Sequence, residues 1–339
     1  VADFANVKWV IRKKDCSIAL AEALNLDYVL IEGSTGLKSN VGEFARSTLK
    51  GHSLTRKLGV DLWVTKYGAI SLGSLLTGCK TICFRDDDID VVPLAAWTSY
   101  PFSKYILVPD VTRVGPFHRK ALRFPGLFEL CYLHPDRFTP DASIYPELGL
   151  NENDAYAIIR LSALKAHHDR GMRGASDELL RQLISMTQGR MKLFITSEKP
   201  LAEEFEPYRC TVPPDRIHHA LAFADFYLGD SQTMASEAAV LGTPSFRIND
   251  FVGRISYLEE LQDYELTFGF TPGQENNLLK KLNEVVAMPE RREVFQDRRN
   301  RMLEDKIDPV PWISRIIEMV LHSCSREQIR KEVCCADWS

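Results

Sequence analysis

The chain has 339 residues, a length that favours two domains. Apolar residues make up 45% and charged residues 26%, so most of the chain is expected to fold around an apolar core. The net charge of −4 and the lack of a long basic stripe argue against nucleic acid as the main ligand. No apolar run reaches about 18 residues, which predicts no membrane-spanning helix.

The eight cysteines are scattered along the chain and form no CxxC pair, so neither a disulfide framework nor a zinc site is expected. No signal peptide is visible at the start. Thiols in apolar runs are typical of a reducing compartment, and the chain is therefore expected to be cytoplasmic.

The first residues are unusual. Residues 1–7 have the composition of a strand and loop, yet a second strand-like run, 9–11, follows at once. A parallel pair needs a crossover of about a dozen residues. Either the first unit is irregular or the numbering closes over a missing segment, and we favour the second explanation.

Short β-rich runs then alternate with helical stretches, which predicts a parallel sheet covered on both faces. The strands expected in this first series are 28–32, 61–65, 81–84 and 105–109, and a helix is expected over 68–78. Residues 110–155 are rich in Pro, Asp and Gly and are predicted to link two domains.

A second series of the same kind begins at Tyr156. Its expected strands are 157–162, 192–197, 226–229, 245–249 and 266–270, and its expected helices are 176–188, 215–223, 234–241 and 273–288. Another helix is expected over 312–322, and the tail 325–339 has no strong pattern. Ser176 is placed to cap the first of these helices.

The most informative stretch is 226–244, FYLGDSQTMASEAAVLGTP. A buried strand runs into Asp230, and the small polar loop Ser231-Gln232-Thr233 opens a helix. The unpaired N–H groups and the dipole of a helix start favour a phosphate there. Glu237 lies about 9 Å along the helix, at 1.5 Å per residue, which is roughly the reach from a diphosphate to the ribose hydroxyls.

The same spacing also fits an ordinary βα unit, with Ser231 as a cap and Glu237 on a solvated face. The run 230–244 resembles the donor-site signature of GT-B glycosyltransferases and of the related non-hydrolysing UDP-GlcNAc 2-epimerases. Further runs resemble one group of uncharacterised prokaryotic proteins, predicted glycosyltransferases of the epimerase-like type. These runs are 124–135 (FPGLFELCYLHP), 156–174 (YAIIRLSALKAHHDRGMRG), 193–199 (LFITSEK) and 213–249.

The resemblance implies that Glu237 binds the donor ribose and that the loop Ser231–Thr233 faces the diphosphate. It does not fix the sugar. The chain departs from true epimerases, which carry a Ser-Gly-Gly loop where this chain has Ser231-Gln232-Thr233 and a His-x-Glu-Ala-Gly segment that has no match here. These two departures put epimerase activity in doubt. Members of the uncharacterised group also begin with a strand and a His-containing loop on the phosphate side, which residues 3–10 do not match.

Three adjacent carboxylates, Asp86 to Asp88, follow the predicted strand 81–84, and α/β enzymes place chemistry at such carboxyl ends. Mutual repulsion is expected to raise the pKa of at least one of them, so Asp86 or Asp88 is a candidate general base. A solvated acidic loop is the alternative. A Mg²⁺ site is a third interpretation, which the metal independence typical of GT-B enzymes disfavours.

Further candidates lie in the second series. His168, in the loop after strand 157–162, is a candidate acid or phosphate ligand, and Arg160 at the strand end is a candidate phosphate ligand. A surface pair of His167 and His168 beside a structural arginine is the alternative. Glu198 is a candidate by its position after strand 192–197. His218 and His219 open the helix before Phe226 and are assigned a structural role.

The sequence thus predicts an α/β, GT-B-like protein with two Rossmann-like domains facing a central cleft. The expected boundaries are 1–140 for the acceptor-side domain, 141–305 for the nucleotide-sugar-binding domain and 306–339 for a C-terminal helical segment that returns to the first domain. Asp230 to Thr233, Glu237, Arg160 and Glu198 are the expected donor-binding residues.

The expected activity is transfer of a sugar from a nucleotide-diphosphate donor, by preference a UDP-sugar, to an acceptor that the sequence does not identify. No metal or other cofactor is expected. Two alternatives stay open: a UDP-sugar 2-epimerase, which would need no acceptor, and a non-catalytic nucleotide-sugar-binding protein. No GxSxG elbow, P-loop or GxGxxG fingerprint supports a hydrolase, an NTPase or an NAD enzyme.

Overall fold

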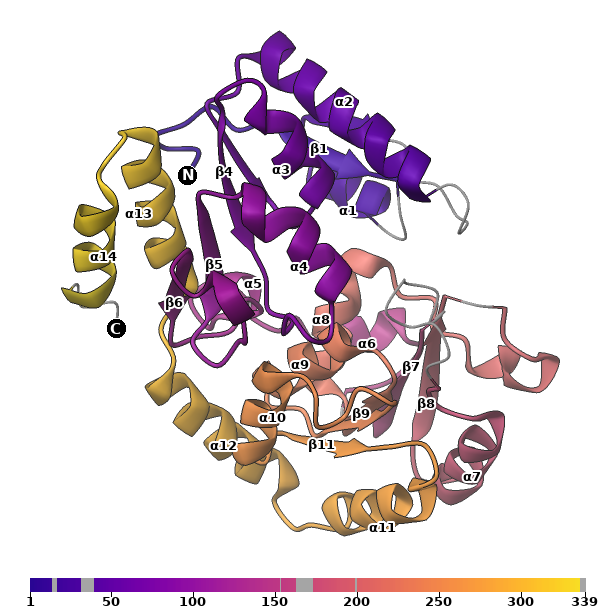
Figure 1. Cartoon of the computed structure of the whole chain (residues 1–339). Coiled ribbons are helices and arrows are strands. Elements are labelled where there is room, and N and C mark those ends of the chain that lie inside the picture. The colour runs from indigo at the N-terminus through magenta and orange to yellow at the C-terminus, as the bar shows by residue number, and fades with distance from the viewer. Residues whose placement is uncertain (14–16, 32–39, 153, 163–172, 199, 336–339) are drawn as a thin grey trace. The chain divides into compact units, whose positions relative to one another are not determined.

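The computed structural model describes residues 1–13, 17–31, 40–152, 154–162, 173–198 and 200–335 (Figure 1). The chain forms two compact units. The first combines Val1–Phe128 with Ile307–Ser339, and the second is Glu129–Lys306. The boundary after Phe128 lies earlier than the expected one at residue 140, and the C-terminal segment belongs to the first unit.

The first unit contains two parallel sheets. One pairs β1 (Trp9–Arg12) with β2 (Tyr28–Ile31), and the other has the order β3-β4-β5-β6. The strands of this second sheet are β3 (Leu62–Thr65), β4 (Lys80–Phe84), β5 (Tyr105–Pro109) and β6 (Ala121–Phe124). Each strand pairs with the next one along the chain, so their carboxyl ends lie along one edge.

Helices join and cover these strands. They are α1 (Ser17–Ala23), α2 (Asn40–Leu58), α3 (Gly68–Leu75), α4 (Pro93–Ser99), α13 (Pro309–Leu321) and α14 (Arg326–Cys335). Trp312 of α13 is buried against Phe124 of β6, with ring centroids 5.1 Å apart. This packing explains why the C-terminal segment belongs with the first unit, because α13 covers apolar side chains of the sheet.

The strand expected within residues 1–7 is not found. Residues 1–7 form no strand, and the first strand is β1. Helix α1 lies in the crossover from β1 to β2, and the register pairs Trp9 with Tyr28. The crossover that a parallel pair needs is therefore supplied by the residues that follow β1, so residues 1–7 need not be a strand.

The second unit contains one five-stranded parallel sheet with the order β11-β10-β9-β7-β8. Its strands are β7 (Tyr156–Leu161), β8 (Lys192–Ser197), β9 (Phe226–Gly229), β10 (Ser245–Ile248) and β11 (Thr267–Phe270). The chain proceeds outward from β7 to β8 and then crosses back to β9. The strand order therefore reverses between β7 and β9, and ligands of open parallel sheets bind at the carboxyl ends of such a pair.

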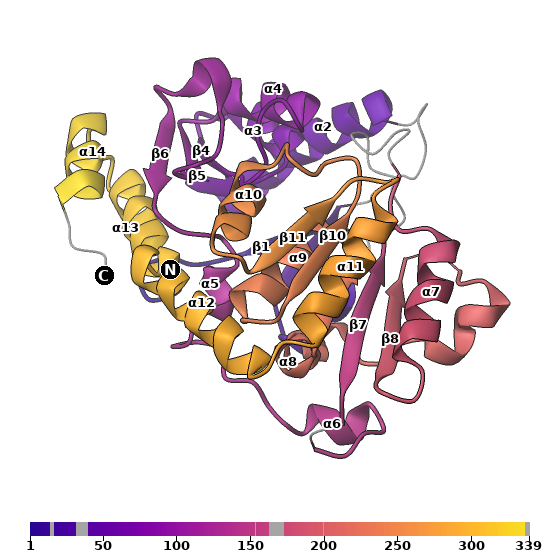
Figure 2. The same ribbon diagram turned by 90° about the horizontal axis from the view of Figure 1, so that it is seen from below.

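The helices of the second unit are α5 (Leu130–Leu133), α6 (Ile144–Glu147), α7 (Asp177–Thr187), α8 (Ile217–Phe223), α9 (Gln232–Val240), α10 (Ser256–Asp263), α11 (Glu275–Val286) and α12 (Arg291–Asp305). Figure 2 shows α9, α10 and α11 beside the central strands. Short 3-10 turns complete the two units, among them η2 (Tyr100–Phe102), η3 (Gly115–Phe117) and η5 (Glu203–Tyr208). The Ser176 side chain accepts from Leu179 N at 3.2 Å, which confirms the expected cap of α7.

Candidate functional site

The loops after β7 and β9 are tied together by one carboxylate. Asp230 Oδ1 accepts from the Ser162 N–H at 2.6 Å, and its own N–H donates to Arg160 O at 3.3 Å. A Cβ atom at Gly174 would lie 2.3 Å from Asp230 Oδ2, so only glycine fits beside this carboxylate. Asp230 is 5% exposed. These contacts anchor the two loops. A phosphate ligand would need a cation at this position, and Asp230 is an anion.

Helix α9 begins directly after this anchor. Ser231 is its N-cap, with the side-chain oxygen 3.4 Å from Met234 N. The N–H groups of Gln232 and Thr233 in the first turn have no acceptor within the helix itself, as helix geometry requires. The Thr233 side chain is exposed. The sequence placed this loop correctly at a helix start, which is a favourable location for an anion.

Glu237 lies further along α9 and is 7% exposed. Its Oε1 accepts from the Tyr132 hydroxyl at 2.9 Å and lies 3.1 Å from His218 Nε2. The Tyr132 and His218 rings are 5.5 Å apart. Helices α5, α8 and α9 thus fix one oxygen of the carboxylate, which limits the rotation of Glu237.

A further hydrogen bond to α9 explains why the two units divide after Phe128. The hydroxyl of Ser236, the residue before Glu237, donates to the Glu129 carboxylate, and Glu129 directly precedes α5. Residues 129–133 therefore belong with α9, although the sequence placed them before the domain boundary. Tyr132 and His218 were not among the predicted site residues. The signal for Tyr132 was its position in the run 124–135, which carries part of the family resemblance.

Arg160 and Glu198, both expected near the donor, contact each other. Arg160 Nη2 donates to Glu198 Oε1 at 2.5 Å, from the carboxyl ends of the neighbouring strands β7 and β8. The Arg160 side chain is 21% exposed, and its Nε is buried without a partner among the described residues. The ion pair neutralises part of the charge that Arg160 would offer to a phosphate.

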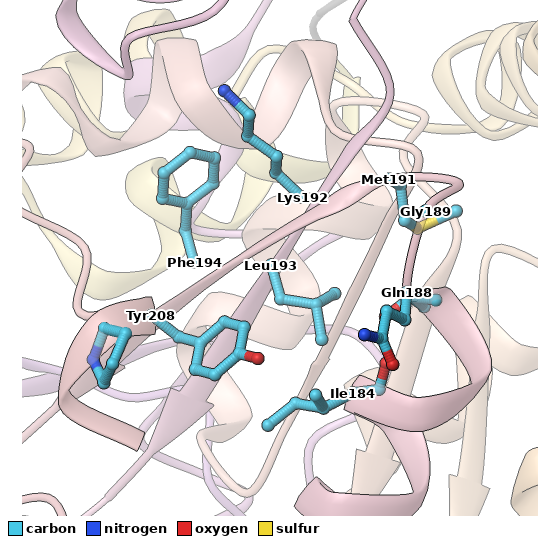
Figure 3. A pocket seen from close by; sticks show the side chains of 10 residues that line it. Ile184, Gln188, Gly189, Met191, Lys192, Leu193, Phe194 and Tyr208 are labelled. Carbon is cyan, nitrogen blue, oxygen red and sulfur yellow. The ribbon is translucent and has the colours of Figure 1, made fainter. Parts of the chain in front are cut away.

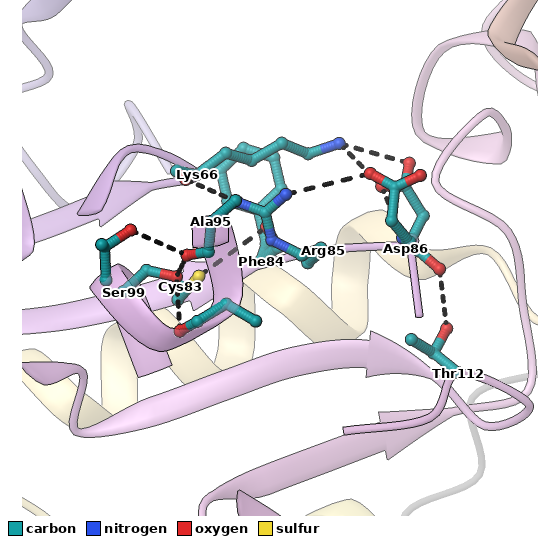
Figure 4. A network of polar contacts seen from close by, with 11 residues as sticks. Lys66, Cys83, Phe84, Arg85, Asp86, Ala95, Ser99 and Thr112 are labelled. Atoms are coloured by element: carbon teal, nitrogen blue, oxygen red, sulfur yellow. Dashed lines mark hydrogen bonds and ion pairs between the residues drawn. The ribbon is translucent and has the colours of Figure 1, made fainter. Parts of the chain in front are cut away.

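The first unit holds a cluster of charges at the carboxyl ends of β3 and β4 (Figure 4). Lys66 Nζ donates to both oxygens of Asp86, at 3.0 and 3.2 Å. The same ammonium group lies 5.4 Å from the Phe84 ring and 5.8 Å from the Phe128 ring. Arg85 Nη2 donates to Lys66 O at 2.8 Å, which holds the backbone of Lys66 beside the pair.

Asp86 does not have the raised pKa that repulsion among the acids suggested. Burial by itself raises the pKa of Asp86, but the Lys66 ammonium and the hydrogen bonds outweigh burial and hold that pKa below its usual value. Burial likewise lowers the pKa of Lys66, but the charges of Asp86 and Asp87 raise it above its usual value. Cations interleave with the acids, so the expected rise in pKa is not found at Asp86.

Asp88 is fully buried, and Arg113 contacts both of its carboxylate oxygens. Its Oδ1 accepts from the Arg113 N–H at 2.6 Å, and its Oδ2 lies 3.2 Å from Arg113 Nη2. Arg113 also pairs with Asp90 at 3.1 Å. A carboxylate with both oxygens engaged and no access to solvent is placed to order the loop after β4. A substrate hydroxyl would have to displace Arg113 to reach Asp88.

Two further expectations concern His168 and metals. His168 and its neighbour His167 lie outside the described residues. Within the ranges described above, no group of three or more His, Cys, Asp or Glu side chains is arranged to hold a metal ion. No helix in this part of the chain is long and apolar enough to cross a membrane.

A pocket of about 310 Å³ lies elsewhere in the second unit (Figure 3). Its walls come from the end of α7, the start of β8 and the turn η5, and they include Ile184, Leu193, Phe194 and Tyr208. The start of β8 is at the opposite edge of the sheet from Asp230 and α9. This pocket is therefore separate from the helix start that the sequence singled out.

Two α/β units with parallel sheets, the second with a capped helix at the reversal of its strand order, have the GT-B fold. The chain is similar to MnaA of S. aureus, solved with UDP, with a TM-score of 0.64 and 11% identity over 93% of this chain and 96% of that one. It is similar to the spinosyn forosaminyltransferase SpnP, with a TM-score of 0.62 and 15% identity over 94% and 92%.

A UDP-N-acetylglucosamine 2-epimerase is also similar, with a TM-score of 0.53 and 13% identity over 85% of this chain and 83% of that one. No protein-family model matches the sequence, and a search of curated proteins gives no significant match. The predicted relationship to GT-B glycosyltransferases and UDP-GlcNAc 2-epimerases is confirmed at the level of the fold.

Proposed function

We propose that this protein is a nucleotide-sugar-dependent glycosyltransferase that takes its donor, by preference a UDP-sugar, in the second unit. The observation that carries the proposal is the capped start of α9 at the reversal of strand order, with Glu237 further along the same helix. A diphosphate at the N–H groups of Gln232 and Thr233 would place the ribose about 9 Å along the helix, near Glu237.

The roles of the other residues follow from their contacts. Glu237 would accept from the ribose hydroxyls with Oε2, because Oε1 already accepts from Tyr132. Arg160 would turn from Glu198 toward the diphosphate, and its buried Nε supplies a further donor. Asp230 orders the loops and is therefore not proposed as a direct ligand of the donor. No metal is required, since the helix start and Arg160 would balance the phosphate charge.

The acceptor side is assigned to the first unit. Asp86 is the carboxylate there that we propose as the general base, because its side chain is 16% exposed whereas that of Asp88 is 0% exposed. Its low pKa makes it a weak base, so its contribution should lie at the low end of the range for base catalysis. His168 remains the alternative base.

The decisive experiment separates binding from turnover. The chain is titrated with UDP in a calorimeter, and a panel of nucleotide-diphosphate sugars is then screened by thermal shift, since a ligand of the folded state raises Tm. Release of UDP from a stabilising sugar nucleotide in the presence of an acceptor mixture would support the transferase. A protein that binds no uridine nucleotide at all would contradict the proposal.

A second candidate function is epimerisation of a UDP-sugar, which is favoured by the similarity to the 2-epimerase structure. That reaction needs no acceptor. Incubation of the pure protein with UDP-GlcNAc alone, followed by NMR of the sugar at C2, distinguishes the two. Appearance of the C2 epimer would replace the transferase proposal.

A further inference from the structure

Basic side chains gather at the amino ends of three neighbouring strands in the first unit. Lys80 is the first residue of β4, Lys104 directly precedes β5, and Lys120 directly precedes β6. Because β4, β5 and β6 are parallel and adjacent, these residues lie along one edge of the sheet. This edge is opposite to the one that holds Lys66 and Asp86.

Helix α14, which lies beside β6 in Figure 1, brings further cations to the same place. Arg326 and Arg330 both donate to the backbone oxygen of Arg119, the second of them at 2.8 Å. The Tyr105 ring lies 5.6 Å from Lys104 Nζ and 5.8 Å from the Arg326 guanidinium. The residues of this cationic cluster are Lys80, Lys104, Arg119, Lys120, Arg326 and Arg330.

The cations of the cluster are not held in ion pairs. None of its six members forms an ion pair with a carboxylate among the residues that the structure describes. They donate to neutral oxygens instead: Lys80 Nζ to Val320 O at 2.8 Å, and Lys120 Nζ to Pro101 O at 2.6 Å. Several arginines elsewhere do form ion pairs, as Arg181 does with Glu204 at 2.8 Å.

The cations also act on one another. Burial lowers the pKa of Lys120, and the charge of Arg326 lowers it further. Burial and the charge of Lys80 lower the pKa of Lys104 in the same way. An anion against this edge would relieve the repulsion. On a chain of net charge −4, such a localised cationic edge would also orient the molecule toward an anionic partner.

One exposed aromatic side chain adjoins the cluster. Trp97 is 56% exposed and packs edge-on against Phe117, at 5.0 Å between centroids. The Lys120 N–H donates to Phe117 O at 2.8 Å, so the aromatic pair adjoins the cations. Lysine and arginine beside an exposed tryptophan match the interface of an anionic membrane better than a soluble polyanion.

We propose that the edge formed by the amino ends of β4, β5 and β6 together with α14 binds the surface of a membrane that contains anionic lipids. The cationic cluster would contact the headgroups, and Trp97 would enter the interface. The carboxyl edge of the same sheet, with Lys66 and Asp86, would stay clear of the lipid. The inference is independent of the proposed sugar transfer, because it uses none of the residues assigned to the donor.

The test is sedimentation of the full chain with vesicles of phosphatidylcholine alone and of phosphatidylcholine mixed with phosphatidylglycerol. We expect binding to the anionic vesicles only, weakened by added salt. Each cation near such a surface contributes roughly a factor of five to the partition coefficient. Lys104→Gln should therefore reduce binding about fivefold, and Arg326→Gln with Arg330→Gln about twenty-five-fold.

Matched variants make the result specific. Arg56→Gln with Lys57→Gln removes the same charge from exposed positions on α2 and should leave vesicle binding almost unchanged. Trp97→Ser should weaken binding to vesicles but not to polyphosphate, and UDP affinity should be the same in all variants. Melting curves exclude unfolding, and Lys104→Gln removes no hydrogen bond found among the described residues.

Four results would overturn the proposal. The first is equal binding to both kinds of vesicle, and the second is no binding to either. The third is binding to polyphosphate without binding to vesicles, which would reassign the edge to a soluble polyanion. Loss of binding in the α2 variant to the same degree would also exclude a localised surface.

Discussion

The Tyr132 hydroxyl donates a hydrogen bond of 2.9 Å to Glu237 Oε1, from a short helix that precedes β7 in the chain. His218 approaches the same oxygen to 3.1 Å. The carboxylate is thereby held before any ligand arrives. Pre-positioned groups bind more tightly, because less side-chain entropy is lost on binding.

Tyr132→Phe should therefore weaken UDP binding by about 1 kcal/mol, the usual net value of one hydrogen bond. The loss should be absent for 2′,3′-dideoxyuridine diphosphate, which has no hydroxyl for Glu237 to accept from. Calorimetry with both nucleotides measures the difference. Tyr264→Phe is the matched control, because it removes a similar bond to Asp305 of 2.7 Å. An equal loss for both nucleotides would indicate a general structural effect.

Glu237→Ala should reduce UDP affinity by about 1.5–3 kcal/mol, the range for hydrogen bonds to a charged group. The fold should survive, although Tyr132 and His218 lose their shared acceptor. Glu284→Ala on α11 removes an exposed carboxylate of the same unit and serves as the control. Unchanged UDP affinity in Glu237→Ala would remove the central assignment of the donor site.

Asp86→Asn and Asp88→Asn should differ in what they impair. Asp86→Asn should lower kcat about a hundredfold while UDP affinity stays constant, because the low pKa makes this base a weak one. Asp88→Asn should instead lower the free energy of unfolding by about 1–3 kcal/mol, since it weakens a buried bond to Arg113. Wild-type turnover in Asp86→Asn would move the base to another residue, with His168 first.

Turnover should persist in excess EDTA, because the helix start at Ser231 and the Arg160 guanidinium are expected to balance the diphosphate charge. The measurement is release of UDP before and after chelation. Complete loss that Mg²⁺ or Mn²⁺ restores would show a metal requirement. In that case, rescue of Asp86→Asn by added cation would assign the metal to the charge cluster of the first unit.

The pair of Lys66 and Asp86 should stabilise the fold over a defined pH window. The Asp86 pKa is lowered in the folded state, so its contribution is present above the unfolded value near 4 and is lost as pH falls through the folded value. The Lys66 pKa is raised, so its contribution is lost only as pH rises past about 10.4.

The Lys66 side chain is 43% exposed, so solvent screening should keep the pair near 1 kcal/mol or less. Urea unfolding of Asp86→Asn and wild type should show a gap at neutral pH that closes well below pH of about 4. A gap that stays constant in acid would show that the effect is packing rather than charge.

Strands and the donor helix could be predicted because their signals are local. The run 226–229 and the cap at Ser231 depend on neighbouring residues and match the structure. Helices α12 and α14 were not predicted, because their charged residues cover too much of the surface to leave a clear apolar stripe. The partners of Asp88 and Glu237 could not be predicted from the sequence for another reason. Arg113 and Tyr132 come from distant positions that only the tertiary structure brings together.

The packing of Trp312 on Phe124 has a consequence for how the protein is made. The first unit is interrupted after Phe128 and completed only by the segment that begins at Ile307. A ribosome therefore releases the whole second unit before α13 exists, and domains generally fold as they emerge. The second unit can reach its native state during translation. The apolar face of β6 stays uncovered until α13 has been synthesised. Chaperone binding during synthesis should accordingly concentrate on residues 105–124.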